Sequence, residues 1–153
     1  MGVSDTGWGI LFARNAQESG DMALICRRAA ENSQTPFFNV QDGFLTTHTI
    51  ENVRLIEPEM MRDFVGDPKT KLRNLFDPYH PIMTGVVQNQ DAYMKGKIAQ
   101  RWYYDQVAPA LEEAFDEFYR NTGRRYGMVS SYRCEDAEYI LVGIGSYMET
   151  AQT

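Results

Sequence analysis

The sequence is short of cysteine and histidine, and this scarcity excludes several kinds of site. Among 153 residues there are two cysteines, Cys26 and Cys134, and two histidines, His48 and His80. The cysteines lie far apart in the chain, so the sequence predicts neither a disulfide framework nor a cysteine-based metal site. We expect two reduced thiols that are packed against other side chains.

Long apolar runs and an excess of basic residues are also missing. No run reaches the roughly 20 apolar residues of a membrane-spanning helix, and residues 1–10 contain no basic stretch or cleavage signature. The net charge is -6, with both signs interspersed, so neither nucleic acid nor an anionic membrane is expected as a partner. With 43% hydrophobic residues, the composition is that of a globular chain with one core, and we expect it in the cytoplasm.

The usual short motifs of phosphate, metal and nucleophile sites are absent. The sequence contains no GxGxxG, GxxxxGK[ST], HExxH, CxxC or GxSxG. The stretch GIGSYM, residues 143–148, has two glycines of a dinucleotide-binding fingerprint but lacks the third. Glycines that permit a tight turn explain this stretch better than a phosphate site does.

The first third of the chain alternates strand and helix signals. WGILFA, residues 8–13, is an apolar run of strand length, and Asn15 and Glu18 are spaced as a capping box before a helix that extends to residue 33. After Pro36, residues 37–42 form a second predicted strand. The order strand, helix, strand favours an α/β fold with a parallel sheet.

The middle of the chain predicts helices around a long irregular connector. A short helix over residues 57–66 is framed by Pro58 and Gly66. Residues 67–91 carry three prolines and an amide cluster, which is typical of a connector without secondary structure. Two further helices are predicted over residues 96–107 and 109–123, with a break at Pro109 and a C-terminal cap at Gly123.

The end of the chain predicts two strands, over residues 128–133 and 139–145, and a short helix with Ser146 as its N-cap. A strand that leads into a helix normally continues to a further parallel strand. No such strand follows residue 146 in this sequence.

Few residues qualify as candidates for chemistry. His48 follows the second predicted strand, close to the crevice where α/β proteins bind ligands, although a structural histidine bonded to nearby hydroxyls or backbone explains it better. His80 lies in the connector, where we expect no ligand. Glu18 and Asp42 are candidate buried carboxylates, but a helix cap explains the first and bonds to the turn amide at Gly43 explain the second. The residues alone indicate a soluble α/β piece with an unidentified crevice.

Several blocks in fixed order carry a family resemblance. They are residues 5–53, which contain DTGWGILFA and DGFLTTH, residues 76–107, which contain YHP and TGVVQNQDAY, residues 122–126, TGRRY, and residues 136–150, which end in GSYMET. Together they resemble the 2-oxoacid:ferredoxin oxidoreductases, above all the single-chain pyruvate:ferredoxin (flavodoxin) oxidoreductases. The resemblance covers nearly the whole chain, and it implies that the chain is an internal piece of a longer protein, which would account for the missing strand.

The resemblance implies a division into three parts. Residues 1–57 would be the C-terminal half of a pyrimidine-type thiamine-diphosphate-binding domain with a parallel α/β fold. Residues 58–124 would be a connector with bridging helices, and residues 125–153 the first strands of a transketolase-C-like α/β domain.

The resemblance also implies a reaction. Such enzymes oxidatively decarboxylate a 2-oxoacid on thiamine diphosphate, join the acyl group to coenzyme A and pass electrons through iron–sulfur clusters to ferredoxin or flavodoxin. The cofactor-activating glutamate, the diphosphate and magnesium ligands and the cluster cysteines are expected in remaining domains or companion subunits of a homo-oligomeric parent protein. Two cysteines cannot hold a four-thiolate cluster, so this segment alone is expected to bind no cofactor and to be inactive.

One position departs from the family pattern. In the pyruvate enzymes an arginine two residues before TG pairs with the substrate carboxylate, whereas this sequence has Ser4 there. Either another 2-oxoacid is used, or Arg14 takes over the carboxylate.

The candidates for the substrate crevice are Ser4, Asp5, Thr6, Arg14 and His48. An alternative is a non-catalytic structural or assembly subunit that keeps the architecture.

Overall fold

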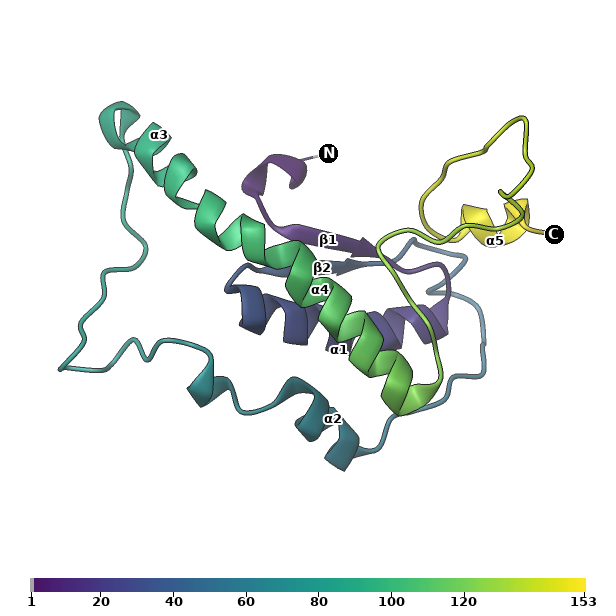
Figure 1. The fold of residues 1–153 in the computed structure, drawn as a ribbon, viewed down its shortest axis with the longest axis horizontal. Coiled ribbons are helices and arrows are strands. Elements are labelled where there is room, and N and C mark those ends of the chain that lie inside the picture. The colour runs from purple at the N-terminus through teal and green to yellow at the C-terminus, as the bar shows by residue number, and fades with distance from the viewer. Residues whose placement is uncertain (1) are drawn as a thin grey trace.

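The computed structural model describes residues 2–153, and a strand, helix, strand unit forms its centre (Figure 1). The unit consists of β1 (Gly9–Phe12), α1 (Ala16–Ser33) and β2 (Phe37–Val40). The two strands are parallel, with Gly9 opposite Phe37 and Phe12 opposite Val40. The predicted α/β class and the parallel sheet are confirmed.

The start of α1 follows the predicted capping pattern in part. The Asn15 side chain accepts a hydrogen bond from the Glu18 backbone N–H at 2.9 Å, which satisfies one free donor of the first turn. The Glu18 carboxylate does not return to Asn15 but accepts from the Arg14 backbone N–H at 2.8 Å. Glu18 therefore ties the end of β1 to the first turn of α1.

The remaining elements are helical. They are η1 (Ser4–Thr6), α2 (Pro58–Val65), η2 (Pro68–Thr70), α3 (Gln90–Ala99), α4 (Arg101–Thr122) and α5 (Tyr147–Ala151). Pro58 begins α2 and Gly66 follows it, as predicted. Gly123 ends α4 in the left-handed conformation with φ 72°, also as predicted. The irregular connector between η2 and α3 forms a long excursion away from the sheet (Figure 1).

The predicted helix break at Pro109 is wrong. Helix α4 runs through Pro109, and the break between α3 and α4 falls at Gln100. A proline inside a helix removes one backbone hydrogen bond and typically costs about 3 kcal/mol. Residues 110–118 of α4 carry all of its buried side chains, so packing on the C-terminal side of Pro109 offsets this loss.

The two strands predicted near the C-terminus are also wrong. Residues 128–133 and 139–145 form turns and irregular structure. A strand requires a hydrogen-bonding neighbour, and in the described part of the chain these segments pair neither with each other nor with β1 or β2. Ser146 precedes α5 but makes no side-chain capping bond, and its backbone is helical rather than extended as in a typical N-cap. Its hydroxyl donates to Asp42.

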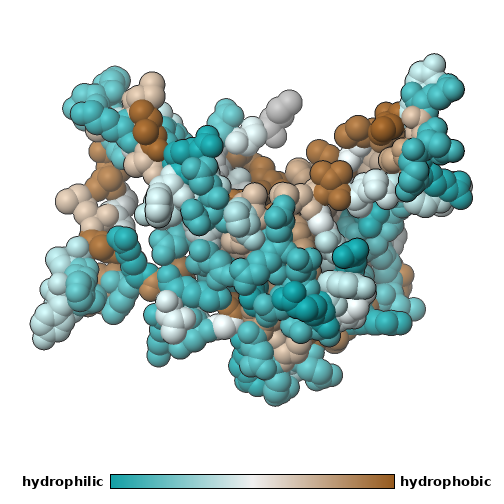
Figure 2. All heavy atoms as spheres, viewed as in Figure 1, coloured by the Kyte–Doolittle hydropathy of each residue, from teal (hydrophilic) through white to brown (hydrophobic). Residues whose placement is uncertain are grey.

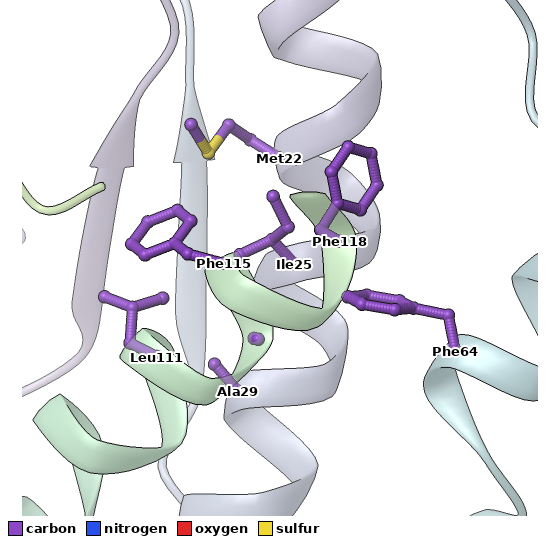
Figure 3. Packing of buried hydrophobic residues seen from close by; sticks show 8 residues of the cluster. Met22, Ile25, Ala29, Phe64, Leu111, Phe115 and Phe118 are labelled. Atoms are coloured by element: carbon purple, nitrogen blue, oxygen red, sulfur yellow. The ribbon is translucent and has the colours of Figure 1, made fainter. Parts of the chain in front are cut away.

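The hydrophobic core joins α1, α2 and α4. Its buried members are Met22, Ile25 and Ala29 from α1, Phe64 from α2, and Leu111, Ala114, Phe115 and Phe118 from α4. Their spacing of three and four residues places each set on one helix face, and Figure 3 shows these faces turned toward one another. Phe64 and Phe118 meet edge to face with ring centroids 5.5 Å apart. Leu11 and Phe37 extend the core to the sheet.

Much apolar surface remains exposed. The rings of Trp8 and Phe38 stack with centroids 4.5 Å apart, and Trp8 and Phe12 are 43% and 44% exposed. Figure 2 shows further apolar side chains on the connector and near the C-terminus. Among the most exposed are Ile50, Leu55, Phe76, Tyr79, Met83, Val87, Val129, Tyr139 and Val142.

This surface predicts self-association of the chain when it is expressed alone. Exposed apolar patches and unpaired strand edges favour intermolecular contact, and each strand has one partner in the described residues. Sedimentation velocity over a range of concentrations should show species larger than a monomer. A monomer at all concentrations with a sharp cooperative thermal transition would contradict the prediction.

The two thiols differ in their surroundings. Cys26 is buried, and burial raises the pKa of its thiol to about 12, so almost no thiolate exists at pH 8. Cys134 is partly exposed. We expect a disulfide reagent at pH 8 to label Cys134 in the native chain and Cys26 only after unfolding. Native labelling that survives Cys134→Ser would contradict this.

Candidate site at the strand ends

Polar side chains gather at the carboxyl ends of β1 and β2. Arg14 and Asn15 follow β1, and Asp42 follows β2. In Figure 1 both strands point toward the C-terminal segment that contains α5. Ligands of parallel α/β folds bind at this edge, so these side chains form the candidate site.

Arg14 is engaged by Glu18. Its Nε and Nη2 donate to Glu18 Oε1 at 3.0 and 2.7 Å. The hydrogen bond to Glu18 raises the pKa of the guanidinium, although partial burial opposes the shift. The Arg14 side chain remains 29% exposed. A substrate carboxylate that binds Arg14 must therefore compete with a carboxylate already present.

Asp42 is held by hydroxyl and amide donors. The Ser146 hydroxyl donates to Asp42 Oδ2, and the Thr46 hydroxyl and backbone N–H donate to Oδ1 at 2.5 and 3.2 Å. These bonds, with that of Ser146 the largest cause, lower the pKa of the carboxyl. The turn amide that Asp42 binds is thus that of Thr46, and not that of Gly43 as predicted.

His48 lies on an exposed turn with local contacts. Its Nδ1 is 2.7 Å from the Thr47 hydroxyl, and its ring stacks on Phe44 with centroids 4.9 Å apart. These contacts fit the structural interpretation of this histidine. His80 is in the exposed connector, where its Nδ1 is 2.9 Å from Asp77 Oδ2.

Ser4, Asp5 and Thr6 lie at the other end of β1. They form η1, which precedes β1, whereas Arg14 follows it. The turn into β1 needs Gly7, because φ is 84° and a Cβ would lie 1.8 Å from the Tyr104 hydroxyl oxygen of α4. The structure therefore separates the serine position from Arg14 by the length of the strand.

Several side-chain contacts join residues far apart in the sequence, and no local pattern predicted them. Asn15 Nδ2 donates to Glu149 Oε1 at 2.5 Å. Asp21 in α1 accepts from Arg124 Nε at 2.6 Å and from the Tyr126 hydroxyl at 2.6 Å. Burial, followed by the bond to Asp21, raises the pKa of Tyr126. Arg124 and Tyr126 belong to the TGRRY block. No local sequence pattern indicates that this block bonds to α1.

The described residues do not fit a magnesium–diphosphate site. Among residues 2–153 no group of three or more histidine, cysteine or acidic side chains is placed to hold a metal ion. The cation at the strand ends, Arg14, is already paired with Glu18.

Within residues 2–153, no helix is long and apolar enough to cross a membrane.

Comparison with known proteins identifies the family. Residues 1–116 match the family model described as "Pyruvate flavodoxin/ferredoxin oxidoreductase, thiamine diP-bdg". The chain belongs to this family. The matched residues include Arg14, Asn15 and Asp42 at the strand ends. The predicted family is thereby confirmed, and the family model is described as thiamine-diphosphate-binding.

Individual relatives are longer than this chain. Pyruvate synthase subunit PorA of Methanothermobacter thermautotrophicus is 34% identical over 148 residues, which are 95% of this chain and 38% of the relative. PorA of Thermotoga maritima is 34% identical over 152 residues, 98% of this chain and 38% of the relative. The pyruvate-flavodoxin oxidoreductase of Klebsiella pneumoniae is 30% identical over 154 residues, 99% of this chain and 13% of the relative. The chain thus spans well under half the length of these relatives.

Proposed function

We propose that this chain forms part of an enzyme that oxidatively decarboxylates a 2-oxoacid, pyruvate or a related acid, to an acyl-CoA and passes the electrons to ferredoxin or flavodoxin. The observation that carries the proposal is the family match over residues 1–116. It is supported by relatives named pyruvate synthase subunit PorA and pyruvate-flavodoxin oxidoreductase. We place the enzyme in the cytoplasm.

In this proposal the chain supplies one wall of the site and other parts supply the cofactor ligands. Thiamine diphosphate, when bound, supplies the carbanion chemistry. Magnesium, the iron–sulfur clusters and coenzyme A would be held by further domains or companion subunits of a homo-oligomer. The chain would contribute its three parts, residues 1–57, 58–124 and 125–153, to that assembly.

The roles of the chain's own residues follow from their chemistry. Arg14 is the cation at the strand ends and is proposed to attract the substrate carboxylate, in competition with Glu18. The alternative is that the substrate carboxylate lies at the other end of β1, where Ser4, Asp5 and Thr6 would contact it and Ser4 would set the preference among 2-oxoacids. Because the length of β1 separates these residues from Arg14, one carboxylate binds at one of the two ends. His48 is proposed as a neighbour of the crevice without a proton-transfer role.

Purification tests this proposal. A tagged chain isolated from its source under anaerobic conditions should bring along companion polypeptides, thiamine diphosphate and iron–sulfur clusters in fixed ratio. Companion polypeptides without cofactor or iron would instead identify the non-catalytic assembly subunit.

The isolated chain is expected to bind thiamine diphosphate negligibly. The described residues form no metal-binding group, and a diphosphate needs a metal ion or several free cationic donors. Calorimetric titration with the cofactor and magnesium should give no binding heat beyond that of a magnesium-free titration. Micromolar affinity would show that the chain holds its own cofactor site.

A further inference from the structure

The C-terminal segment returns to the strand ends at two points. The contacts of Ser146 with Asp42 and of Glu149 with Asn15 join residues 104 and 134 positions apart. Ser146 is 7% exposed, whereas Tyr139, Leu141 and Val142 just before it are largely exposed. We call residues 143–151 the strap, because it lies across the ends of both strands at these anchors.

Asn15 and Asp42, the two residues that bind the strap, are each oriented by hydrogen bonds to nearby residues. Asn15 Oδ1 accepts from the Glu18 backbone N–H, so its amide nitrogen is left to donate to Glu149. Asp42 Oδ1 is held by Thr46, so its Oδ2 is left to accept from Ser146. Because bonds to residues outside the strap orient both groups, little side-chain entropy should be lost on docking.

The strap brings a second carboxylate to Arg14. Glu149 binds Asn15, the residue that follows Arg14, and its charge adds to that of Glu18 in raising the pKa of the guanidinium. An anion approaching Arg14 therefore meets the Glu18 carboxylate and, when the strap is docked, that of Glu149.

We propose that the strap is a gate for anionic substrate, in which Asn15 and Asp42 are positioning residues and the docked Glu149 carboxylate competes with a 2-oxoacid carboxylate for Arg14. This inference rests on the proposed function for the identity of the anion. Release of the strap removes one competing charge, so it favours binding of the substrate carboxylate.

Hydrogen exchange of the full chain tests docking without any substrate. Asn15→Asp keeps the oxygen that caps α1, but it replaces the amide donor to Glu149 by a carboxylate that repels it. Asp42→Asn leaves one acceptor oxygen for the donors of Thr46 and Ser146. Both should speed exchange of amides in residues 143–151 by about tenfold, while α1 amides stay unchanged. Asp136→Asn, in the exposed part of the C-terminal region, is the matched control. Unchanged strap exchange in both variants would overturn the inference.

Kinetics of the complete enzyme test the gate. Glu149→Gln and Asp42→Asn should lower the KM for a 2-oxoacid about threefold to fivefold, the effect of a nearby partly exposed charge, with kcat within twofold. Asp136→Asn removes the same charge far from Arg14 and should have no effect. Faster strap exchange with unchanged KM would overturn the gate and leave the proposed function intact. Absence of any 2-oxoacid activity in the unmodified enzyme would refute the proposed function and the gate with it, whereas the exchange result would still report on docking.

Discussion

Asp21→Asn is expected to lower the free energy of unfolding by about 3 kcal/mol. Asp21 is 1% exposed and accepts from Arg124 Nε and Nη2 at 2.6 and 2.9 Å. It also accepts from the Tyr126 hydroxyl at 2.6 Å and from Gln17 Nε2 at 3.1 Å. Asparagine has the same shape but offers one acceptor oxygen to these four donors. Its NH2 group would lie against donors that it cannot satisfy, and Arg124 would lose the negative charge that it pairs with.

Urea unfolding followed by circular dichroism measures this change, with all variants at one fixed protein concentration because self-association alters the apparent stability. Asp116→Asn, on the exposed face of α4, removes the same charge without a buried partner and should change stability by less than about 0.5 kcal/mol. Equal effects of the two substitutions would show that the contact between α1 and residues 124–126 does not anchor the chain after α4.

Ser4→Arg is expected to raise the specificity constant for pyruvate, relative to larger 2-oxoacids, by roughly ten- to a hundredfold in the complete enzyme. A single charge-assisted hydrogen bond of about 1.5–3 kcal/mol corresponds to this range. Ser4 lies in η1, at the opposite end of β1 from Arg14, so the new guanidinium does not crowd the existing one.

Steady-state kinetics on pyruvate and two larger 2-oxoacids separate the possibilities. Val3→Arg adds the same charge at an exposed residue next to η1 that has no proposed contact with the substrate, and it serves as the matched control. Equal losses on all three substrates in Ser4→Arg would show that position 4 has no part in recognising the substrate carboxylate.

Local signals made the centre of the fold predictable. The cap at Asn15 and Glu18 located the start of α1, and Pro36 preceded β2. Pro58 and Gly66 bounded α2 in the same way. Each of these features depends on residues within one or two turns of each other, so periodicity and capping patterns suffice to find them.

Long-range contacts account for what was missed. Apolar composition predicted strands over residues 128–133 and 139–145, but strand formation depends on a pairing partner that composition does not reveal. The bonds of Asp42 to Ser146 and of Asp21 to Arg124 join residues 104 and 103 positions apart. Neither pair carries a spacing pattern, so only the folded chain shows them.

We propose above all that this chain works within a thiamine-diphosphate-dependent 2-oxoacid oxidoreductase. Its most direct test is reduction of ferredoxin or flavodoxin by the native assembly that contains the chain, measured anaerobically with pyruvate and larger 2-oxoacids. We predict reduction that requires a 2-oxoacid, coenzyme A and thiamine diphosphate together. An assembly that holds the chain but reduces neither carrier with any 2-oxoacid would contradict the claim.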